Sequence, residues 1–263
     1  MVKTFYFRYT DLNYVSFYWR EKMKLVIDHL EKEFKGKQVI KDASFEFQKG
    51  RIYGLLGRNG AGKTTLFNCI SKDLSYENGS ILLEKEDKLE DYKETDIGLV
   101  HATPNVPDFM TGYEFIKFFI DMNQHQMKNI RTPDAYLAKV GIKKEDRHRL
   151  MKEYSHGMRN KVQMIATMMI QPPILLLDEP LTSFDVVAAH EVKELILSMK
   201  SESVVIFSTH ILQLAQDLCD EIVLLHNGEL KGIPASRIHD ADFESEIVRL
   251  LSDEDGGSED DRN

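Results

Sequence analysis

The chain has 263 residues, of which 42% are hydrophobic, so it is long and apolar enough to bury a sizeable core. Its formal net charge is −9, from 34 Lys and Arg against 43 Asp and Glu, which disfavours a protein held on nucleic acid by a general basic field. Its most apolar run, 164–170, is too short to span a bilayer, and its two cysteines cannot form a disulfide framework. These features predict a folded, cytosolic protein without a membrane span of its own.

The segment 1–22 is unusually rich in aromatic residues. We expect it to be either a leader upstream of the true start or an accessory arm that packs on a membrane partner. Met23 then opens the sequence MKLVIDHLEKEF, whose alternation of apolar and polar residues predicts a strand and the start of the domain.

From residue 23 to about 233, short apolar runs alternate with longer helical ones, a pattern that predicts an α/β core with a mostly parallel sheet. The predicted strands are apolar nearly throughout, which is typical of strands buried on both faces. They are expected at 51–56, 174–177, 204–207 and 222–225.

The stretch from about 104 to 170 is rich in helical patterns and predicts an inserted helical subdomain. Thr111 and Glu114 have the spacing of a capping box, and Thr132-Pro133 predicts a second helix start.

The end of the domain carries three further signals. Asn227-Gly228 separates two apolar runs and favours a type I′ hairpin. A C-terminal helix is expected within 234–251, amphipathic over 243–251, and the strongly acidic tail 252–263 is expected to be disordered.

A phosphate-binding loop is the strongest local signal. The string GRNGAGKTT follows the predicted strand RIYGLL and precedes a helical run. Glycines let the backbone curl until several N–H groups converge on one anion, and the following helix adds its free N–H groups. Lys63 is expected to reach the β- and γ-phosphates, and Thr64 to place its hydroxyl on Mg²⁺. The residues expected to bind the phosphates are Gly57, Arg58, Asn59, Gly60, Ala61, Gly62, Lys63, Thr64 and Thr65.

An acidic pair follows another predicted strand in ILLLDEP, at the edge where open α/β sheets bind ligands. Asp178 suits the magnesium shell, and Glu179 is placed to orient or deprotonate a water aimed at the γ-phosphate. Such a pair is often only a capped strand end. Together with the phosphate loop it predicts hydrolysis of a nucleoside triphosphate.

The sequence YSHGMRNKVQM, residues 154–164, resembles the signature motif of the ATP-binding cassette (ABC) family, whose usual form is LSGGQ followed by a helix. Ser155 and Gly157 fit that motif, whereas Tyr154, His156 and Met158 depart from it. The resemblance covers about residues 23–233. It implies a P-loop NTPase core with an antiparallel β subdomain and an inserted helical subdomain, ATP and Mg²⁺ as cofactors, and a site completed by a second cassette.

The resemblance places three more residues. Phe34 matches the aromatic that stacks on adenine in the family, with an ordinary core strand residue as the alternative. Asp185, in LTSFD, matches the aspartate of the loop along the dimer seam, and Ser155 and Gly157 would meet the γ-phosphate on the opposite subunit. His210, in STH, matches the family's switch histidine, although an isolated histidine is more often structural.

One position departs from the family in a way that bears on the metal. In the segment 96–111, Ala102 occupies the position of the family's magnesium-binding glutamine. Because alanine offers no oxygen, we expect magnesium to rely on Thr64, water and phosphate, with slower turnover. The family also uses this segment to contact the membrane subunit.

The resemblance implies the ATPase subunit of a membrane transporter, peripheral on the cytoplasmic face of the cell membrane. Its expected partners are a separate transmembrane permease and a second ABC ATPase subunit, identical or different, with no nucleic acid. The SHGM-type signature and the lack of a large C-terminal regulatory domain favour export of a peptide, antimicrobial or other small compound. The alternatives are a soluble ABC ATPase acting on nucleic acid or the ribosome, and a non-hydrolysing ATP-binding module.

Overall fold

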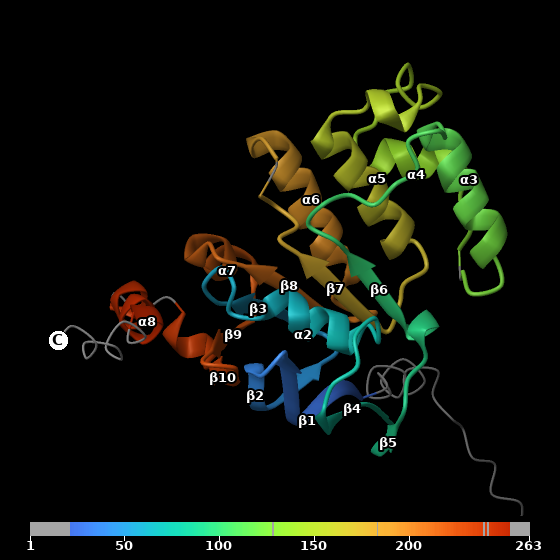
Figure 1. Ribbon diagram of the computed structural model, residues 1–263. Helices are drawn as coiled ribbons and strands as arrows, with labels where there is room; N and C mark the ends of the chain where they lie inside the picture. Colours follow the sequence, from blue (N-terminus) through green and yellow to red (C-terminus); the bar gives the residue numbers. More distant parts are fainter. Residues whose placement is uncertain (1–21, 128, 183, 239, 241, 253–263) are drawn as a thin grey trace, which may run out of the picture.

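Two β-sheets with a helix between them form the framework of the computed structural model (Figure 1). The structure describes residues 22–127, 129–182, 184–238, 240 and 242–252. The predictions for the aromatic segment 1–22 and for the acidic tail 252–263 therefore lie outside the described residues, except at Lys22 and Ser252.

The larger sheet has six strands in the order β10-β9-β3-β8-β7-β6, and only β10 runs antiparallel to its neighbour. All four strands expected from the apolar runs are present, which confirms those predictions, and three of them, β3, β7 and β8, are buried along their whole length. The strands are β3 (Ile52–Leu56), β6 (Ile97–Val100), β7 (Ile174–Asp178), β8 (Val204–Thr209), β9 (Glu221–His226) and β10 (Glu229–Ile233).

The smaller sheet is antiparallel, in the order β2-β1-β4-β5. Its strands are β1 (Met23–Phe34), β2 (Lys37–Gln48), β4 (Asn78–Lys85) and β5 (Lys88–Glu90). Its inner face and one face of the larger sheet enclose α2 (Lys63–Ile70), whose buried residues Leu66, Phe67 and Ile70 contact both sheets. The expected α/β fold with a mostly parallel sheet and an antiparallel sheet is confirmed.

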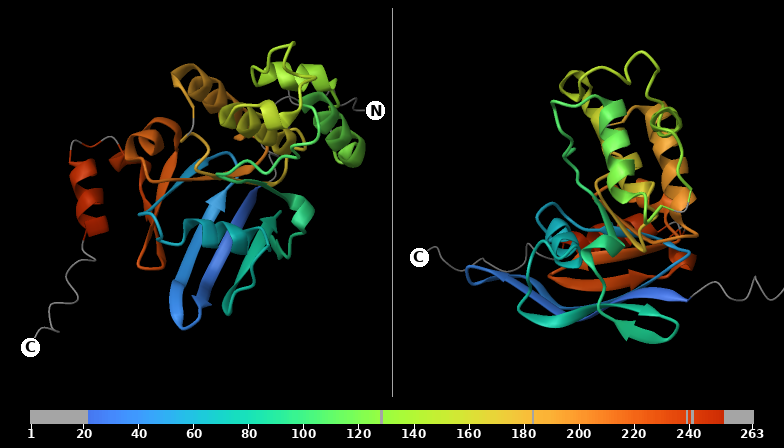
Figure 2. Two further views of the ribbon diagram at one scale, coloured as in Figure 1. Left: turned by 45° about the horizontal axis from the view of Figure 1, so that its top comes forward. Right: turned by 90° about the vertical axis from the view of Figure 1, so that its right-hand side faces the viewer.

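The other face of the larger sheet is covered by helices, which rise from it in both views of Figure 2. Alternate residues of one strand serve the two sides: Leu175 and Leu177 pack toward these helices, whereas Ile174 and Leu176 pack toward α2. The helices are α3 (Gly112–Asn123), α4 (Pro133–Lys139), α5 (His156–Met168), α6 (Val186–Met199) and α7 (Leu212–Leu218). Short 3-10 turns lie at Glu94–Asp96, Met151–Glu153 and Ala235–Arg237.

The local capping signals agree with the structure. Thr111 accepts a hydrogen bond from the Glu114 backbone, and the Glu114 carboxylate accepts one from the Thr111 backbone, so the capping box at the start of α3 is confirmed. Thr132 caps α4, which has Pro133 at its start. Asn227 and Gly228 both have positive φ, at 53° and 82°, and join β9 to β10 as a two-residue hairpin of the expected kind.

Helix α8 (Phe243–Ser252) is the last described element and packs through Phe243 and Ile247 against the outer strands of the larger sheet. Across the described ranges, none of the helices has both the length and the apolar character that crossing a membrane demands.

Candidate active site

Three neighbouring parallel strands bring the predicted site together. The register pairs Leu56 at the end of β3 with Thr209 on β8, and Ser208 with Asp178 at the end of β7. The segments that follow these strands therefore start at one edge of the sheet: the phosphate loop, the Asp178-Glu179 pair and the 208–210 segment. These segments are up to about 150 residues apart in the chain, and the sheet makes them neighbours.

The phosphate loop runs from the end of β3 into α2 and depends on its glycines. Gly60 and Gly62 have φ of 84° and 104°, in the left-handed region that favours glycine, and Gly62 is the residue before the first turn of α2. A Cβ at Gly57 would lie 2.8 Å from the carbonyl oxygen of Leu225, so this position has no room for a side chain. Arg58, Asn59 and Thr65 complete the loop, in which the Ala61 N–H donates to the Arg58 carbonyl at 3.1 Å.

Lys63 lies beneath this loop with its side chain nearly buried. Its ammonium donates to the carbonyl oxygens of Gly57 and Arg58, at 2.7 and 3.2 Å, and lies 4.0 Å from Oε1 of Glu179. Burial lowers the pKa of Lys63 below its usual range, and the nearby carboxylates of Glu179 and Asp178 oppose that shift. The carbonyl and carboxylate oxygens around it stabilise the charged form of Lys63. The site therefore presents a positive charge close to the N–H groups of the loop.

Thr64 and Asp178 meet directly. The Thr64 hydroxyl donates to Oδ2 of Asp178 at 2.9 Å, and Oδ1 of Asp178 accepts a hydrogen bond from the Ser208 hydroxyl at 2.5 Å. A hydroxyl and a carboxylate are hard oxygen donors of the kind that Mg²⁺ takes from proteins when phosphates supply further ligands. Among the described residues there is no cluster of three acidic, histidine or cysteine side chains suited to an all-protein metal cage. The donor set therefore fits a magnesium ion bound together with a nucleotide.

Glu179 and His210 form a hydrogen-bonded pair. Nδ1 of His210 lies 2.9 and 3.0 Å from the two carboxylate oxygens of Glu179. Glu179 has φ of 48°, a left-handed conformation that costs a non-glycine residue about 1–2 kcal/mol and that turns the chain immediately after β7. The Glu179 N–H donates to Ser208 Oγ at 3.0 Å, and the Thr182 hydroxyl donates to the Glu179 carbonyl at 2.9 Å, so both ends of this turn are held.

Ser208 was not singled out by sequence reasoning, yet it contacts both acidic residues. Its hydroxyl donates to Asp178, and its oxygen accepts from the backbone of Glu179. It is fully buried at the end of β8. Its place at the carboxyl end of a strand was the available signal, but only the register of β7 and β8 shows which carboxylate it meets.

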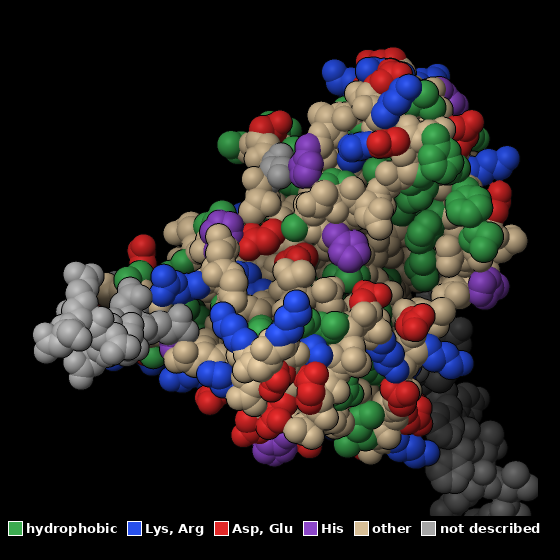
Figure 3. Space-filling view, in the orientation of Figure 1, with side chains coloured by type: hydrophobic (Ala, Val, Ile, Leu, Met, Phe, Trp, Pro, Cys, Tyr) green, Lys and Arg blue, Asp and Glu red, His purple; other side chains and the backbone are tan. Residues whose placement is uncertain are grey.

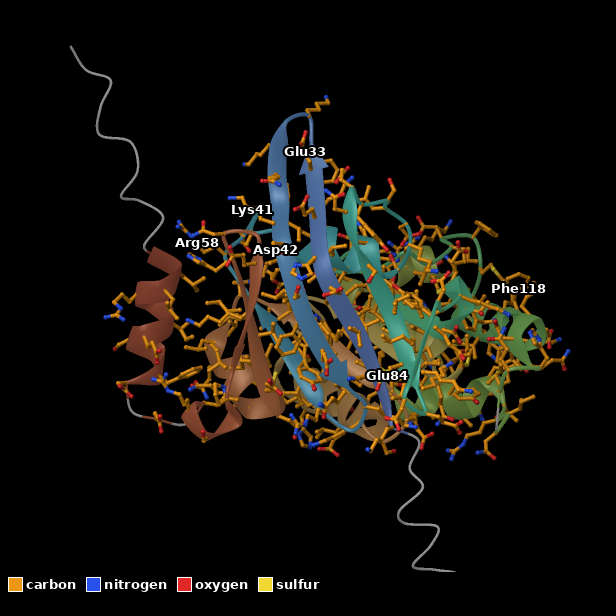
Figure 4. All side chains as sticks on the ribbon, turned by 90° about the horizontal axis from the view of Figure 1, so that it is seen from below. Glu33, Lys41, Asp42, Arg58, Glu84 and Phe118 are labelled. Atoms are coloured by element: carbon orange, nitrogen blue, oxygen red, sulfur yellow. The ribbon has the colours of Figure 1, made fainter. Side chains whose placement is uncertain are left out.

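A surface cavity of about 560 Å³ adjoins the phosphate loop. Arg58, Asn59, Gly60 and Ala61 form one wall, and Lys37, Val39 and Lys41 of β2, the 225–228 hairpin and Leu251 of α8 form the others. Lys41 and Arg58 lie on the same side of the molecule as α8 (Figure 4). The lining contains lysine and arginine but no carboxylate, so the cavity favours an anion.

Phe34, expected at the adenine, does not line this cavity. It ends β1 with a relative exposure of 44%, and the Lys32 ammonium lies 5.1 Å from its ring centroid. This exposure excludes the alternative that Phe34 is an ordinary core residue of the strand. Its ring is accessible for stacking, but the structure does not bring it to the cavity wall.

Ser155, Gly157 and Asp185 lie on the helical part of the molecule. Ser155 caps α5, accepting from the Met158 N–H at 3.2 Å, and Asp185 caps α6, accepting from the Ala188 N–H at 2.9 Å. Ser155, Gly157 and Asp185 are not among the residues that line the cavity. In one copy of the chain, these residues therefore lie away from the cavity beside the phosphate loop.

The family model described as "ABC transporter" matches residues 40–182, more than half of the chain. The chain belongs to the ABC transporter ATP-binding family. As a member of the ABC ATPases it binds nucleotide and hydrolyses ATP.

Individual ABC proteins show the same likeness. The uncharacterized ABC transporter ATP-binding protein YdbJ of Bacillus subtilis (strain 168) is 30% identical over 235 residues, covering 88% of this chain and 75% of its own. The bacitracin transport ATP-binding protein BcrA of Enterococcus faecalis is 29% identical, covering 82% of this chain and 72% of its own. The solved dimeric ATP-binding cassette MJ0796, bound to ADP and Pi, has the same fold, with a TM-score of 0.67, 18% identity and coverage of 80% and 98%.

Proposed function

We propose that this chain is the ATP-hydrolysing subunit of a membrane transporter and powers a separate permease at the cytoplasmic face of the cell membrane. The observation that carries the proposal is the convergence of Lys63, Asp178, Glu179 and His210 at the ends of three adjacent strands, inside a chain of the ABC transporter family.

The geometry supports specific roles for these residues. Lys63 and the N–H groups of the loop bind the phosphates, because a buried cation and converging donors stabilise their charge. Glu179 accepts the proton of the attacking water, and His210 orients its carboxylate through the pair at 2.9–3.0 Å. The ammonium of Lys63 lies 4.0 Å from Glu179, so it would attract a phosphate to the neighbourhood of this base.

Thr64 and Asp178 would hold a magnesium ion. When bound, such an ion neutralises charge on the transferred phosphoryl group. Ser208 keeps the Asp178 carboxylate in place for that task, since it donates to the oxygen that Thr64 does not use.

A second copy or a second ABC subunit would complete the site. Ser155 and Gly157 begin a 13-residue helix whose N-terminus favours negative charge, and they are accessible on the surface, as is Asp185 at the start of α6. The dimeric form of the cassette bound to ADP and Pi supports this arrangement by analogy. ATP held between the two copies would then stabilise the dimer.

The permease would bind on the helical part of the molecule. Hydrophobic side chains gather over α3 on the face shown in Figure 3, and Phe118 projects from α3 at the edge opposite Arg58 (Figure 4). Phe109, Phe118 and Met122 have relative exposures of 80%, 54% and 59%, which is typical of a surface that contacts a partner. The likeness to a bacitracin transport protein supports export of a peptide or other antimicrobial compound.

Purification in mild detergent tests the transporter assignment. The tagged chain is expected to co-purify with a membrane protein whose presence raises the rate of ATP hydrolysis, and Lys63→Ala is expected to abolish that rate without preventing co-purification. Recovery of ribosomes or nucleic acid in place of a membrane protein would contradict the proposal.

Ala102→Gln tests the consequence of the missing metal ligand. Ala102 follows β6 and ends in a methyl group, so the variant restores an oxygen where the family has one. We expect the magnesium concentration for half-maximal hydrolysis to fall and the rate to rise about 3–10-fold, equivalent to one additional oxygen ligand of modest strength.

The measurement is a magnesium titration of ATPase activity in the assembled complex, with Ala102→Leu as a control of similar size that lacks the oxygen. Identical titrations and rates in Ala102→Gln and the unmodified protein would rule out a role for position 102 in metal binding.

A further inference from the structure

The segment between β6 and α3, residues 101–111, is joined to α5 by two side chains of that helix. This segment, the β6–α3 loop, includes Ala102 and Phe109, and α5 begins at the signature residues Ser155 and Gly157. Arg159 and Gln163 are four residues apart and therefore lie on one face of α5. Both side chains make polar contacts with the loop.

Gln163 uses both ends of its amide on the backbone of the loop. Its Nε2 donates to the carbonyl oxygen of His101 at 3.0 Å, and its Oε1 accepts from the N–H of Asn105 at 2.6 Å. Gln163 is a buried residue, with a relative exposure of 6%. Because a buried amide that loses either partner leaves unpaired polar groups, the loop from 101 to 105 and the helix are held in one relative position.

Arg159 holds the second half of the loop. Its guanidinium forms an ion pair with Asp108, and its Nε donates to the Met151 carbonyl at 3.0 Å. The Met151 N–H in turn donates to the Met110 carbonyl at 2.8 Å. The loop is thus bound to α5 at two points, about one turn (Arg159) and two turns (Gln163) after Ser155.

We propose that Gln163, supported by Arg159, is a positioning residue for ATP hydrolysis. It holds the β6–α3 loop and α5, the signature helix, in a fixed relative position, so that the two move together. The inference rests on the proposed function of the site. Residue 102 lacks an oxygen to couple the loop to metal or water, so in this chain the bonds to α5 carry the coupling. A displacement of the exposed Phe109 would then move Ser155 and Gly157 together with the loop.

Gln163→Leu tests this inference, because leucine fills a similar volume and makes neither hydrogen bond. In the purified full-length chain, hydrogen exchange at the Asn105 amide should accelerate at least about tenfold, since its acceptor is gone. The Kd for ATP at low protein concentration should stay within about twofold, because both hydrogen bonds of Gln163 go to His101 and Asn105, outside the phosphate loop. The kcat should fall about 10–100-fold, as expected when a remote change misplaces groups needed in the transition state.

Gln216→Leu is the matched control. Gln216 also donates its amide to a backbone carbonyl of another element, that of Ile238 at 2.7 Å, but it lies on α7 away from the loop. This variant should keep both kcat and Kd within twofold. Arg159→Met changes a partly exposed side chain and should also lower kcat. If Gln163→Leu does not fold, the kcat of Arg159→Met tests the inference in its place.

Two results would overturn the inference. One is an unchanged kcat in Arg159→Met and in a folded Gln163→Leu whose Asn105 amide exchanges faster, which would make the bonds structural only. The other is a raised Kd for ATP with an unchanged kcat in Gln163→Leu, which would place the effect of the substitution at the phosphate loop. Failure of the proposed function is a different observation: the unmodified chain would hydrolyse no ATP, or its hydrolysis would persist in Lys63→Ala.

Discussion

Glu179→Gln is expected to lower ATP hydrolysis by about 10²–10⁴-fold, the range that a general base contributes, while ATP binding persists. The variant keeps the shape of the side chain and can still hydrogen-bond His210, but it cannot accept a proton. Since the nucleotide is no longer consumed, the ATP-bound dimer should accumulate. Single-turnover hydrolysis and size-exclusion chromatography with ATP and magnesium measure these two effects.

Glu194→Gln is the control for this substitution, because Glu194 is an exposed carboxylate on α6, outside the site. It should hydrolyse ATP at the unmodified rate and give no stable dimer. Near-normal turnover in Glu179→Gln would remove Glu179 from the role of base. A preparation of Glu179→Gln that binds ATP but stays monomeric with its partners present would contradict the two-copy site.

Lys63→Ala has the second large expected effect, on binding itself. The Lys63 ammonium lies in the phosphate loop, where it donates to the Gly57 and Arg58 carbonyls. A hydrogen bond from such a charged group to a phosphate contributes about 1.5–3 kcal/mol, so without it the affinity for ATP should fall roughly 10–100-fold. Titration with a fluorescent ATP analogue measures the change. The loss should be smaller for AMP, because this lysine is assigned to the β- and γ-phosphates.

Lys144→Ala, at an exposed lysine between α4 and α5, provides the control and should bind ATP normally. Thermal unfolding of Lys63→Ala must accompany the titration, because the substitution also removes hydrogen bonds to the Gly57 and Arg58 carbonyls. An unchanged ATP affinity in the folded variant would contradict the assignment of Lys63.

Local chemistry made part of the fold predictable. The apolar runs at β3, β7, β8 and β9 are buried on both faces, so their composition alone marks them as strands. The capping box at Thr111 and the hairpin at Asn227-Gly228 each rest on residues that contact one another within a few positions of the chain. Such signals need no knowledge of the rest of the molecule.

The contacts within the site depend on partners far apart in the chain. Thr64 and Asp178 are 114 residues apart in the chain, and Glu179 and His210 are 31 apart. Their contacts could be predicted only once the pairing of β3, β8 and β7 was known. Ser208 and Gln163 were missed for this reason. A buried serine at a strand end and a glutamine within a helix have no local pattern that distinguishes them from ordinary core residues.

By itself, the sequence determined the α/β class and predicted the phosphate loop and the candidate residues for phosphate, metal and water, because these predictions follow from residue type and short spacing. Only the tertiary structure decided that Ser208 holds both acidic residues, that Phe34 lies away from the cavity wall and that Gln163 binds the β6–α3 loop to the signature helix. The physical reason is that hydrogen bonds and packing act over a few ångströms in space, and strand register and helix packing decide which distant residues come within that range.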